Sequence, residues 1–328
     1  MISSSGDDRA FAPCSLRWMC HDSGVTLDAS ARSFLDLLIE AGRPALDEMA
    51  PPEAREASKA TALLAGSGAE VASVDQRRIA GVPCVVITPI GAGSHPVIVW
   101  FHGGGWVLGS ADQSTAVTMD LAAAAGCVVV SVDYRLAPEH PAPSAMVDCS
   151  AVTTWVIEHG REEGWDSSRV AVGGDSAGGN LAALVAQEQA DALRAQLLVY
   201  PVTDLTRSSP SYIKNGDGHL LTARMMRWFV DLYLGGTGID PADPTVSPAG
   251  ASSRRLSHTA RAAIITAGYD PLRDEGRAYA EALRAAGVTV DHREWEGQIH
   301  AFFGLREAIP EAGEAIEWLA DRAREAFA

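Results

Sequence analysis

The chain has 328 residues, 47% of them hydrophobic and 21% charged, and it carries a formal net charge of −16. A chain of this length buries a large core, as one α/β domain or as a core with a small second module. Because 42 acidic residues outnumber 26 basic ones, nucleic acid and anionic membranes are disfavoured as partners. No apolar run approaches the roughly 18 residues of a membrane span, and residues 1–17 lack the basic and apolar regions of a signal peptide.

The five cysteines are scattered and odd in number. Cys84, Cys127 and Cys149 stand among apolar residues, which is typical of buried free thiols. No Cys-x-x-Cys pair and no Cys/His spacing suggests a zinc site. We therefore expect no metal and a reducing, cytoplasmic location.

Residues 1 to about 25 are polar and mixed, and we expect them to be poorly ordered. Apolar residues at helical spacing follow at 27–41, and a second helical stretch covers 52–64. Both stretches precede any strand, so we expect them to form a layer separate from the sheet. Two strand candidates, 71–79 and 82–88, flank the turn Ala80-Gly81 and predict an antiparallel hairpin.

Short apolar runs and helical patterns then alternate, which predicts a mostly parallel sheet with helices on both faces. The expected strands are 96–101, 127–132, 170–172, 195–200, 262–266 and 288–295, and the expected helices are 113–125, 145–159, 181–189, 274–286 and 308–328. The alternation breaks at 205–238, which contains one helical run, 222–234, rich in Met and aromatic residues. We interpret 205–238 as an insertion over the carboxyl edge of the sheet, although an ordinary core helix explains those residues equally well.

The chain is organised around residues 169–180, where a buried strand, a glycine-rich turn and a helix follow one another. The turn Gly174-Asp175-Ser176-Ala177-Gly178 fits the pattern G-x-S-x-G in the strand–turn–helix context that the pattern needs. A serine hydroxyl lifted clear of the backbone requires unfavourable backbone angles, and glycines let the strand and the helix pass closely. The pattern predicts Ser176 as a nucleophile, with an incidental serine in a glycine-rich turn as the alternative.

A second glycine-rich segment, His102-Gly103-Gly104-Gly105-Trp106, follows the apolar run at 96–101. Neither segment fits the phosphate-binding pattern G-x-x-x-x-G-K-[ST] or the dinucleotide pattern G-x-G-x-x-G. An HGGG loop after the third strand is instead the partner of a nucleophile elbow, because its backbone N–H groups turn toward an oxyanion. Two such motifs in this order indicate a hydrolase.

A serine nucleophile needs a neighbouring base that an acid holds in place. In a parallel sheet such groups lie just past the carboxyl ends of strands. Asp270 stands there after the strand at 262–266, and His300 alone among nine histidines lies in a glycine-containing loop beyond a late strand. The order Ser176, Asp270, His300 is that of α/β-hydrolases. The competing acids are Asp204, Asp274 and Glu275.

The chain resembles the bacterial hormone-sensitive-lipase-like esterases, which are α/β-hydrolases of the HGGG and GDSAG type. The matching segments are HGGGW at 102–106, YRLAPEHPAP at 134–143, GDSAGGN at 174–180 and DPLRDEG at 270–276, with His300 following. The resemblance spans about residues 71–326 and implies an α/β-hydrolase fold: a mostly parallel eight-stranded sheet flanked by helices, with a helical cap. One departure is Ala142, where the family usually carries Phe.

The resemblance also implies the roles of individual residues. Ser176 would be the nucleophile, His300 its base and Asp270 the acid that orients the base. The oxyanion hole would consist of the N–H groups of Gly103, Gly104 and Ala177.

Two further expectations concern the surroundings of this site. Trp106, beside the oxyanion glycines, is expected to line the substrate pocket, with simple packing as the alternative. Prolines pin the loop 134–143, which we expect Arg135 and Glu139 to tie by a buried pair without any catalytic role.

We therefore predict a carboxylesterase that acts on small esters by a Ser-His-Asp acyl-enzyme mechanism, with short acyl chains implied by the resemblance. Amide or carbamate hydrolysis by the same triad is the alternative among enzymes. A non-catalytic ligand-binding homologue, as plant gibberellin receptors are, is disfavoured because His300 is present.

The expected organisation is a set of N-terminal cap helices at 1–65, a catalytic core at 66–204 and 239–328, and a cap insertion at 205–238. No cofactor is implied. A homodimer, if one forms, would use the last strand and helix.

Overall fold

One eight-stranded sheet organises the computed structural model, which describes residues 26–42 and 44–328. The strands are β1 (Ser73–Ile79), β2 (Val82–Thr88), β3 (Val97–Phe101), β4 (Val128–Val132), β5 (Val170–Asp175), β6 (Ala195–Val199), β7 (Arg261–Tyr269) and β8 (Val290–Ile299). Their order in the sheet is β1-β2-β4-β3-β5-β6-β7-β8. β2 pairs antiparallel with β1 and with β4, and all later neighbours are parallel. The predicted hairpin and the mostly parallel sheet are confirmed.

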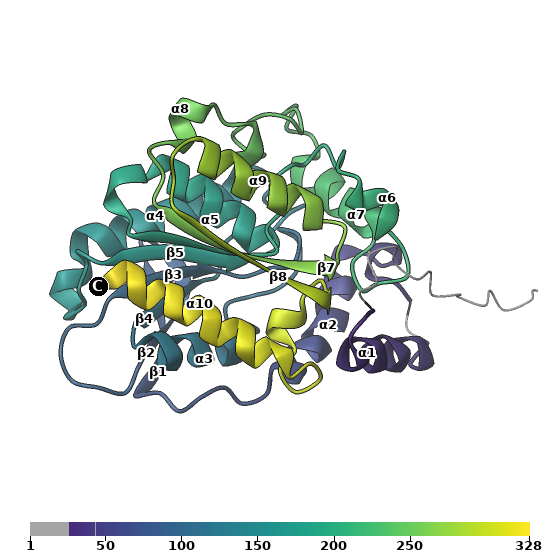
Figure 1. Cartoon of the computed structure of the whole chain (residues 1–328). Coiled ribbons are helices and arrows are strands. Elements are labelled where there is room, and N and C mark those ends of the chain that lie inside the picture. Colours follow the sequence, from purple (N-terminus) through teal and green to yellow (C-terminus); the bar gives the residue numbers. More distant parts are fainter. Residues whose placement is uncertain (1–25, 43) are drawn as a thin grey trace, which may run out of the picture.

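Helices cover both faces of the sheet, as the alternation predicts. The helices of the described residues are α1 (Ala29–Glu40), α2 (Pro51–Ala62), α3 (Thr115–Ala125), α4 (Ser144–His159), α5 (Ala177–Glu188), α6 (Ser211–Lys214), α7 (Ala223–Leu234), α8 (Ser253–Leu256), α9 (Arg273–Ala285) and α10 (Glu311–Phe327), with 3₁₀ turns η1 (Leu46–Glu48) and η2 (Leu63–Ala65) among the connections. Figure 1 shows α4, α5 and α9 over one face and α3 and α10 over the other.

Each central strand supplies two hydrophobic cores, because successive side chains point to opposite faces. In β3, Val97, Val99 and Phe101 lie in the core beneath α4, α5 and α9, whereas Ile98 and Trp100 lie in the core beneath α3 and α10. Both faces of β3 are therefore buried against apolar side chains, which explains why its sequence is an unbroken apolar run.

Two late strands are longer than their apolar runs predict. β7 continues to Tyr269 and β8 to Ile299, and these two residues pair after an irregularity at Ala267. The segment 296–299, predicted as part of a glycine-containing loop, is therefore strand. His300 follows that strand directly. The expectation for residues 1–25 lies outside the described residues.

Three buried cysteines, Cys84, Cys127 and Cys149, are free thiols, as predicted. Burial raises the pKa of the Cys84 thiol to about 12, so this group stays protonated at neutral pH. Within the part of the chain that the structure describes, no helix has the length and apolar character needed to cross a membrane.

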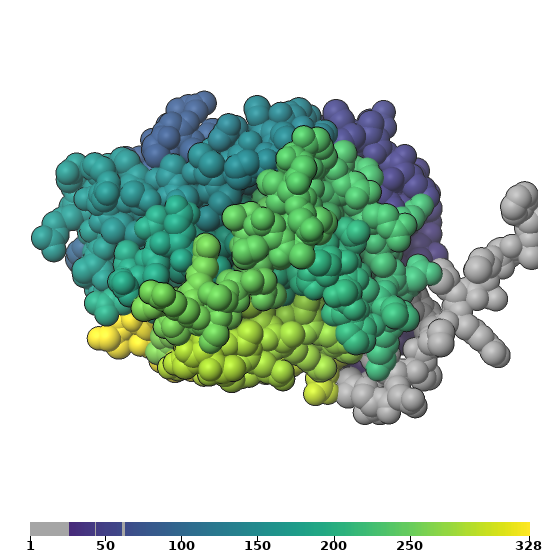
Figure 2. Space-filling view, turned by 90° about the horizontal axis from the view of Figure 1, so that it is seen from above, coloured from purple at the N-terminus to yellow at the C-terminus, as the bar shows by residue number. Residues whose placement is uncertain are grey.

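The N-terminal helices and the segment 205–238 meet at the end of the molecule where the parallel strands terminate (Figure 1). Figure 2 shows the N-terminal residues in purple beside this segment in green. Arg224 of α7 pairs with Asp47 at 2.8 Å and with Glu48 at 3.0 Å, both in η1. Two segments far apart in the sequence thus lie side by side over the carboxyl edge of the sheet.

The ion pair predicted within the loop 134–143 is wrong. Arg135 pairs with Asp148 of α4 at 2.7 Å, and Glu139 pairs with Arg55 of α2 at 2.6 Å. Both Arg135 and Glu139 are about half exposed at the side chain, so neither contact is a buried pair.

Arg55 attaches α2 to two segments that follow central strands of the sheet. Its Nε donates to the carbonyl oxygen of Val107 and one terminal nitrogen to that of Ala137, both at 2.8 Å. The guanidinium also forms two hydrogen bonds to the carboxylate of Glu139 and lowers the pKa of that carboxyl to about 2. One side chain thus ties α2 to the stretch after β3 and to the loop after β4.

Candidate active site

The turn that carries Ser176 is strained at the serine. Its φ of 56° and ψ of −117° lie outside the regions that side-chain-bearing residues normally adopt, and α5 begins at the next residue, Ala177. A Cβ on Gly178 would lie 1.9 Å from the carbonyl oxygen of Phe101, and one on Gly174 would lie 2.5 Å from it. Glycine is therefore required at both positions, and the elbow packs directly on the end of β3.

The structure brings Ser176, Asp270 and His300 together at the carboxyl ends of β5, β7 and β8. Oγ of Ser176 lies 2.9 Å from Nε2 of His300, and Nδ1 of His300 lies 2.6 Å from Oδ2 of Asp270. A carboxylate oxygen can only accept a hydrogen bond, so Nδ1 of His300 carries a proton. In the neutral ring, Nε2 is then free to accept the hydroxyl proton of Ser176. All three side chains are buried.

Neighbouring groups hold the acid and the imidazole. Oδ1 of Asp270 accepts the N–H of Leu272 at 2.8 Å. The side-chain amide of Asn215 donates to the main-chain carbonyl of Asp270 at 3.0 Å, and the ring of Tyr200 lies 4.5 Å from that of His300 between centroids. Sequence reasoning missed Asn215, because it lies in the segment 205–238 outside the helical run 222–234, and no motif marks its position.

Of the two amides predicted in the loop 102–106, that of Gly104 has no hydrogen-bond partner among the described residues, whereas that of Gly103 has one. The N–H of Gly103 donates to Oδ1 of Asp175 at 3.1 Å, which argues against Gly103 as an oxyanion donor. The N–H groups of Gly104 and Gly105 have no hydrogen-bond partner among the described residues. Their φ values of 112° and 61° are readily adopted only by glycine. Ala177 contributes the first amide of α5, directly after Ser176.

Asp175 is a second residue that sequence reasoning missed. It ends β5 and immediately precedes the nucleophile candidate, and burial raises the pKa of its carboxyl to about 6. The proximity of His300 and the hydrogen bond from Gly103 both oppose that shift. The motif GDSAG includes this aspartate, but the resemblance assigned no role to it, and the shorter pattern G-x-S-x-G leaves the position unspecified.

Trp106 is wholly buried, and its ring stacks on Tyr233 of α7 with centroids 4.4 Å apart. Phe229, also of α7, lies against Gly105, where an added Cβ would come within 2.2 Å of its ring. These contacts join the loop 102–106 to the segment 205–238. They favour the packing alternative for Trp106 over the predicted lining of the substrate pocket.

Two of the competing acids are engaged elsewhere. Asp274 forms an ion pair with Arg273 at 2.7 Å, in the first turn of α9. Glu275 is buried and accepts the N–H of Thr203 at 2.7 Å, and burial raises the pKa of its carboxyl well above the ordinary value. Of the four candidate acids, Asp270, Asp204, Asp274 and Glu275, only Asp270 bonds to His300 in the described structure.

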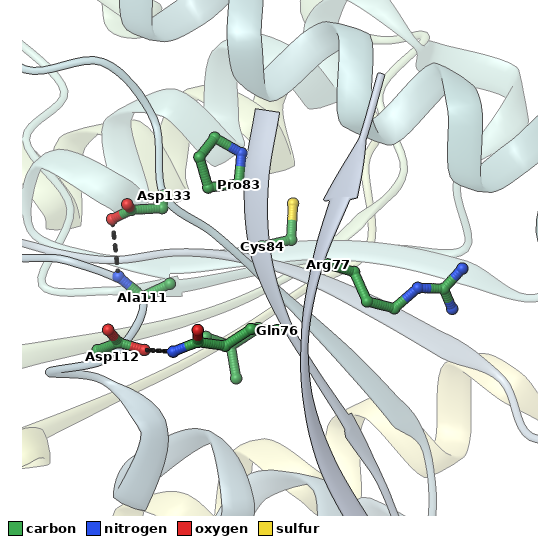
Figure 3. A pocket seen from close by; sticks show the side chains of 8 residues that line it. Gln76, Arg77, Pro83, Cys84, Ala111, Asp112 and Asp133 are labelled. Atoms are coloured by element: carbon green, nitrogen blue, oxygen red, sulfur yellow. Dashed lines mark hydrogen bonds between the residues drawn. The ribbon is translucent and has the colours of Figure 1, made fainter. Parts of the chain in front are cut away.

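A small cavity of about 140 Å³ lies apart from these residues, beside the hairpin of β1 and β2 (Figure 3). Asp133 lines it and accepts the N–H of Ala111 at 3.2 Å, and Gln76 donates to Asp112 at 3.1 Å. None of Ser176, Asp270 and His300 lines this cavity, so it is not the candidate active site. Among the described residues, no group of three or more His, Cys, Asp or Glu side chains could hold a metal ion.

Comparison with known proteins agrees with this geometry. A family described as alpha/beta hydrolase fold matches residues 98–304. The carboxylic ester hydrolase LipN of Mycobacterium tuberculosis is 47% identical over 233 residues, covering 68% of this chain but only 61% of LipN. An ethyl acetate hydrolase of Pseudomonas putida is 35% identical over 312 residues, covering 89% of this chain and 96% of that protein. The solved esterase of Pyrobaculum calidifontis superposes with a TM-score of 0.84 at 35% identity, over 93% of this chain and all of that one.

Proposed function

Because this chain belongs to the α/β-hydrolase fold family, among its hormone-sensitive-lipase-like esterases, and is a carboxylic ester hydrolase, we propose that Ser176, His300 and Asp270 carry out the hydrolysis. The observation that carries this proposal is the continuous hydrogen-bonded path from Oγ of Ser176 through His300 to Asp270, at 2.9 Å and 2.6 Å. The path supplies a nucleophile, a base and an orienting acid in the geometry that acyl transfer needs.

In the first half of the reaction, Nε2 of His300 takes the hydroxyl proton while Oγ of Ser176 attacks the ester carbonyl carbon. The carboxylate of Asp270 stabilises the imidazolium that results and keeps the ring in the correct orientation. His300 then gives its proton to the leaving alcohol, and the acyl group stays on Ser176. Water releases the acid by the same steps, with His300 again acting as the base.

The tetrahedral intermediates carry a negative charge on the former carbonyl oxygen, which needs fixed donors. We assign this task to the N–H groups of Gly104, Gly105 and Ala177. Two observations support the assignment: the two glycine amides have no other partner among the described residues, and the Ala177 amide opens α5 beside the nucleophile. The Gly103 amide is left out because Asp175 already occupies it.

The relatives indicate that the substrate is an ester, and we further propose that this ester is small. The Pseudomonas putida relative that matches nearly the whole chain is named for the hydrolysis of ethyl acetate, an ester with a two-carbon acyl group. Phe229 and Tyr233 of α7 pack against the loop 102–106, and we infer that these aromatic side chains restrict the length of the acyl group. We therefore assign small esters with short acyl chains.

The domain organisation, the assembly and the location remain predictions. We propose that residues 1–65 and 205–238 form a cap on the core at 66–204 and 239–328. The ion pairs from Arg224 to η1 support this view, because they join the two cap segments directly. We also propose a homodimer through β8 and α10 and a cytoplasmic location.

Covalent labelling tests the assignment of the nucleophile. A p-nitrophenyl alkylphosphonate should transfer its phosphonyl group to Oγ of Ser176, with p-nitrophenolate as the leaving group and the serine proton passing to His300. Peptide mass spectrometry should then locate one phosphonyl group on the peptide that contains Ser176, in step with the loss of esterase activity. Labelling elsewhere with activity lost in parallel would refute the assignment.

A further inference from the structure

Asp175 places a carboxylate beside the nucleophile, and no step of the mechanism above involves this carboxylate. Its Oδ1 accepts the N–H of Gly103 at 3.1 Å, across 72 residues of sequence. The contact is close, because a Cβ added at Gly103 would lie 2.2 Å from Oδ2 of Asp175. The carboxylate therefore lies directly against the start of the loop that carries the free glycine amides.

The peptide group between His102 and Gly103 is held at both of its polar ends. Its carbonyl oxygen accepts the hydroxyl of Tyr134 at 2.7 Å, and its N–H donates to Asp175. A peptide group fixed at its oxygen and at its nitrogen cannot rotate about the chain direction. Asp175 supplies one of the two contacts that fix it.

The next peptide group, between Gly103 and Gly104, is fixed in turn. Its carbonyl oxygen accepts Nδ1–H of His102 at 2.7 Å, and this assignment of the proton follows because a carbonyl oxygen can only accept. In a trans peptide group the N–H points away from the C=O. The N–H of Gly104 is therefore aimed to the side opposite His102, and its aim depends on the fixed peptide group before it.

The same carboxylate also joins the two segments that supply oxyanion donors. Asp175 directly precedes Ser176 and Ala177 in the chain, and its side chain is hydrogen-bonded to the loop that holds Gly104 and Gly105. A hydrogen bond from an amide to an ionised carboxylate is about twice as strong as one between neutral groups. This hydrogen bond is therefore suited to fix the position of the Gly104 and Gly105 N–H groups relative to the N–H group of Ala177.

We propose that Asp175 is a positioning residue of the oxyanion hole: by holding the N–H of Gly103, it aims the neighbouring glycine amides at the oxyanion and keeps them in register with the amide of Ala177. This inference rests on the function proposed above. Its effect falls on the charged intermediate and not on the substrate, so removal of the carboxylate should lower kcat and leave KM nearly unchanged.

The test compares Asp175→Ala, Asp175→Asn and wild type with p-nitrophenyl butyrate at pH 8, where Asp175 is ionised. We expect Asp175→Ala to lower kcat about 30-fold with KM within about 3-fold of wild type. Asp175→Asn, whose side-chain oxygen still accepts the Gly103 N–H, should recover most of that loss. Ser176→Ala serves as the reference for complete loss.

A second readout reports on the oxyanion directly. Butyl trifluoromethyl ketone binds serine hydrolases through a bond from the serine oxygen to the ketone carbon. The serine proton passes to the histidine, and the carbonyl electron pair moves to the oxygen, which becomes an oxyanion. We expect the inhibition constant to rise in Asp175→Ala by about the factor by which kcat falls, and to return toward the wild-type value in Asp175→Asn.

Asp133 offers a matched control, because it too accepts a backbone N–H near the carboxyl end of a strand, β4, but contacts Ala111 instead of Gly103. Asp133→Ala should bind the ketone as wild type does. The proposal is overturned if Asp175→Ala keeps wild-type kcat and ketone affinity, if Asp175→Asn is as impaired as Asp175→Ala, or if Asp133→Ala loses as much ketone affinity. A wild-type protein that hydrolyses no ester would instead refute the function proposed above, so the two failures are distinguishable.

Discussion

Oγ of Ser176 lies 2.9 Å from Nε2 of His300, although 124 residues separate them in the sequence. If this contact is that of a nucleophile and its base, Ser176→Ala should lower kcat for p-nitrophenyl butyrate by at least about 10⁴-fold. The serine hydroxyl contributes little volume, so the melting temperature should stay within a few degrees of wild type. Near-wild-type turnover by the folded variant would exclude Ser176 as the nucleophile.

The identity of the acid can be tested by substituting two aspartates that lie four residues apart, Asp270 and Asp274. Asp270→Asn should lower kcat by about 10⁴-fold, because an amide no longer fixes the required tautomer of His300. Asp274→Asn should stay near wild type, since Asp274 pairs with Arg273 and not with the histidine. Steady-state kinetics of the two purified variants decide between them, and a larger loss in Asp274→Asn would contradict the assignment.

The raised pKa of Asp175 predicts how stability depends on pH. The folded carboxyl keeps its proton up to a pKa of about 6, whereas the unfolded one loses it near its ordinary value of about 4. Wild type should therefore lose stability as the pH rises from about 4 to 6, by at most about 3 kcal/mol. Asp175→Asn has no such group and should be spared this loss.

Urea unfolding of both proteins at pH 4, 5, 6, 7 and 8 measures this difference. The free energy of unfolding of Asp175→Asn relative to wild type should increase from pH 4 to about pH 6 and then level off. A difference that is independent of pH would show that burial does not penalise the charge of Asp175.

Arg55 should contribute to stability well beyond an ordinary surface ion pair. In Arg55→Ala, the carbonyl groups of Val107 and Ala137 lose their donor, so the free energy of unfolding should fall by about 1–3 kcal/mol. Lys59 lies in the same helix and, within the described part of the chain, pairs only with exposed Glu56. Lys59→Ala is therefore the control, with an expected change of less than about 1 kcal/mol. Equal effects in thermal or urea unfolding would contradict this role of Arg55.

The acyl-chain preference can be read from a series of p-nitrophenyl esters from C2 to C16. Because Phe229 and Tyr233 pack on the loop 102–106, kcat/KM should be highest at short chains and fall steeply with length. A maximum at C10 or above would contradict the assignment of small substrates. Parallel assays with matched amides separate ester hydrolysis from the amide alternative.

The sequence predicted what depends on local pattern. Ser176, Asp270 and His300 each follow a strand of a parallel sheet, and the carboxyl ends of such strands lie on one edge, so their proximity could be inferred without coordinates. The mostly parallel sheet itself could be predicted because strands buried on both faces leave unbroken apolar runs. Even so, the end of β8 was placed too early, since Glu296, Gly297 and Gln298 have the composition of a loop but belong to β8, which pairs with β7 again at Ile299.

The sequence could not show which side chains form ion pairs or hydrogen bonds across a long sequence separation, because such partners depend on the direction in which each side chain points. Glu139 was assigned to Arg135, four residues away, but it pairs with Arg55, 84 residues away. Likewise, the G-x-S-x-G and HGGG patterns locate the backbone N–H groups near the nucleophile, but they do not show which of these groups already donate a hydrogen bond within the protein. Only the position of the Asp175 carboxylate reveals that the Gly103 amide is already bonded.

The contacts of Arg55 also bear on protein engineering. A chimaera that takes its first 65 residues from a relative inherits whatever residue stands at position 55, while Val107, Ala137 and Glu139 come from the recipient. The N-terminal segment is thus no interchangeable module: the arginine and its carboxylate must be exchanged together. A graft whose α2 lacks the arginine would leave two backbone oxygens and one carboxylate without their donor.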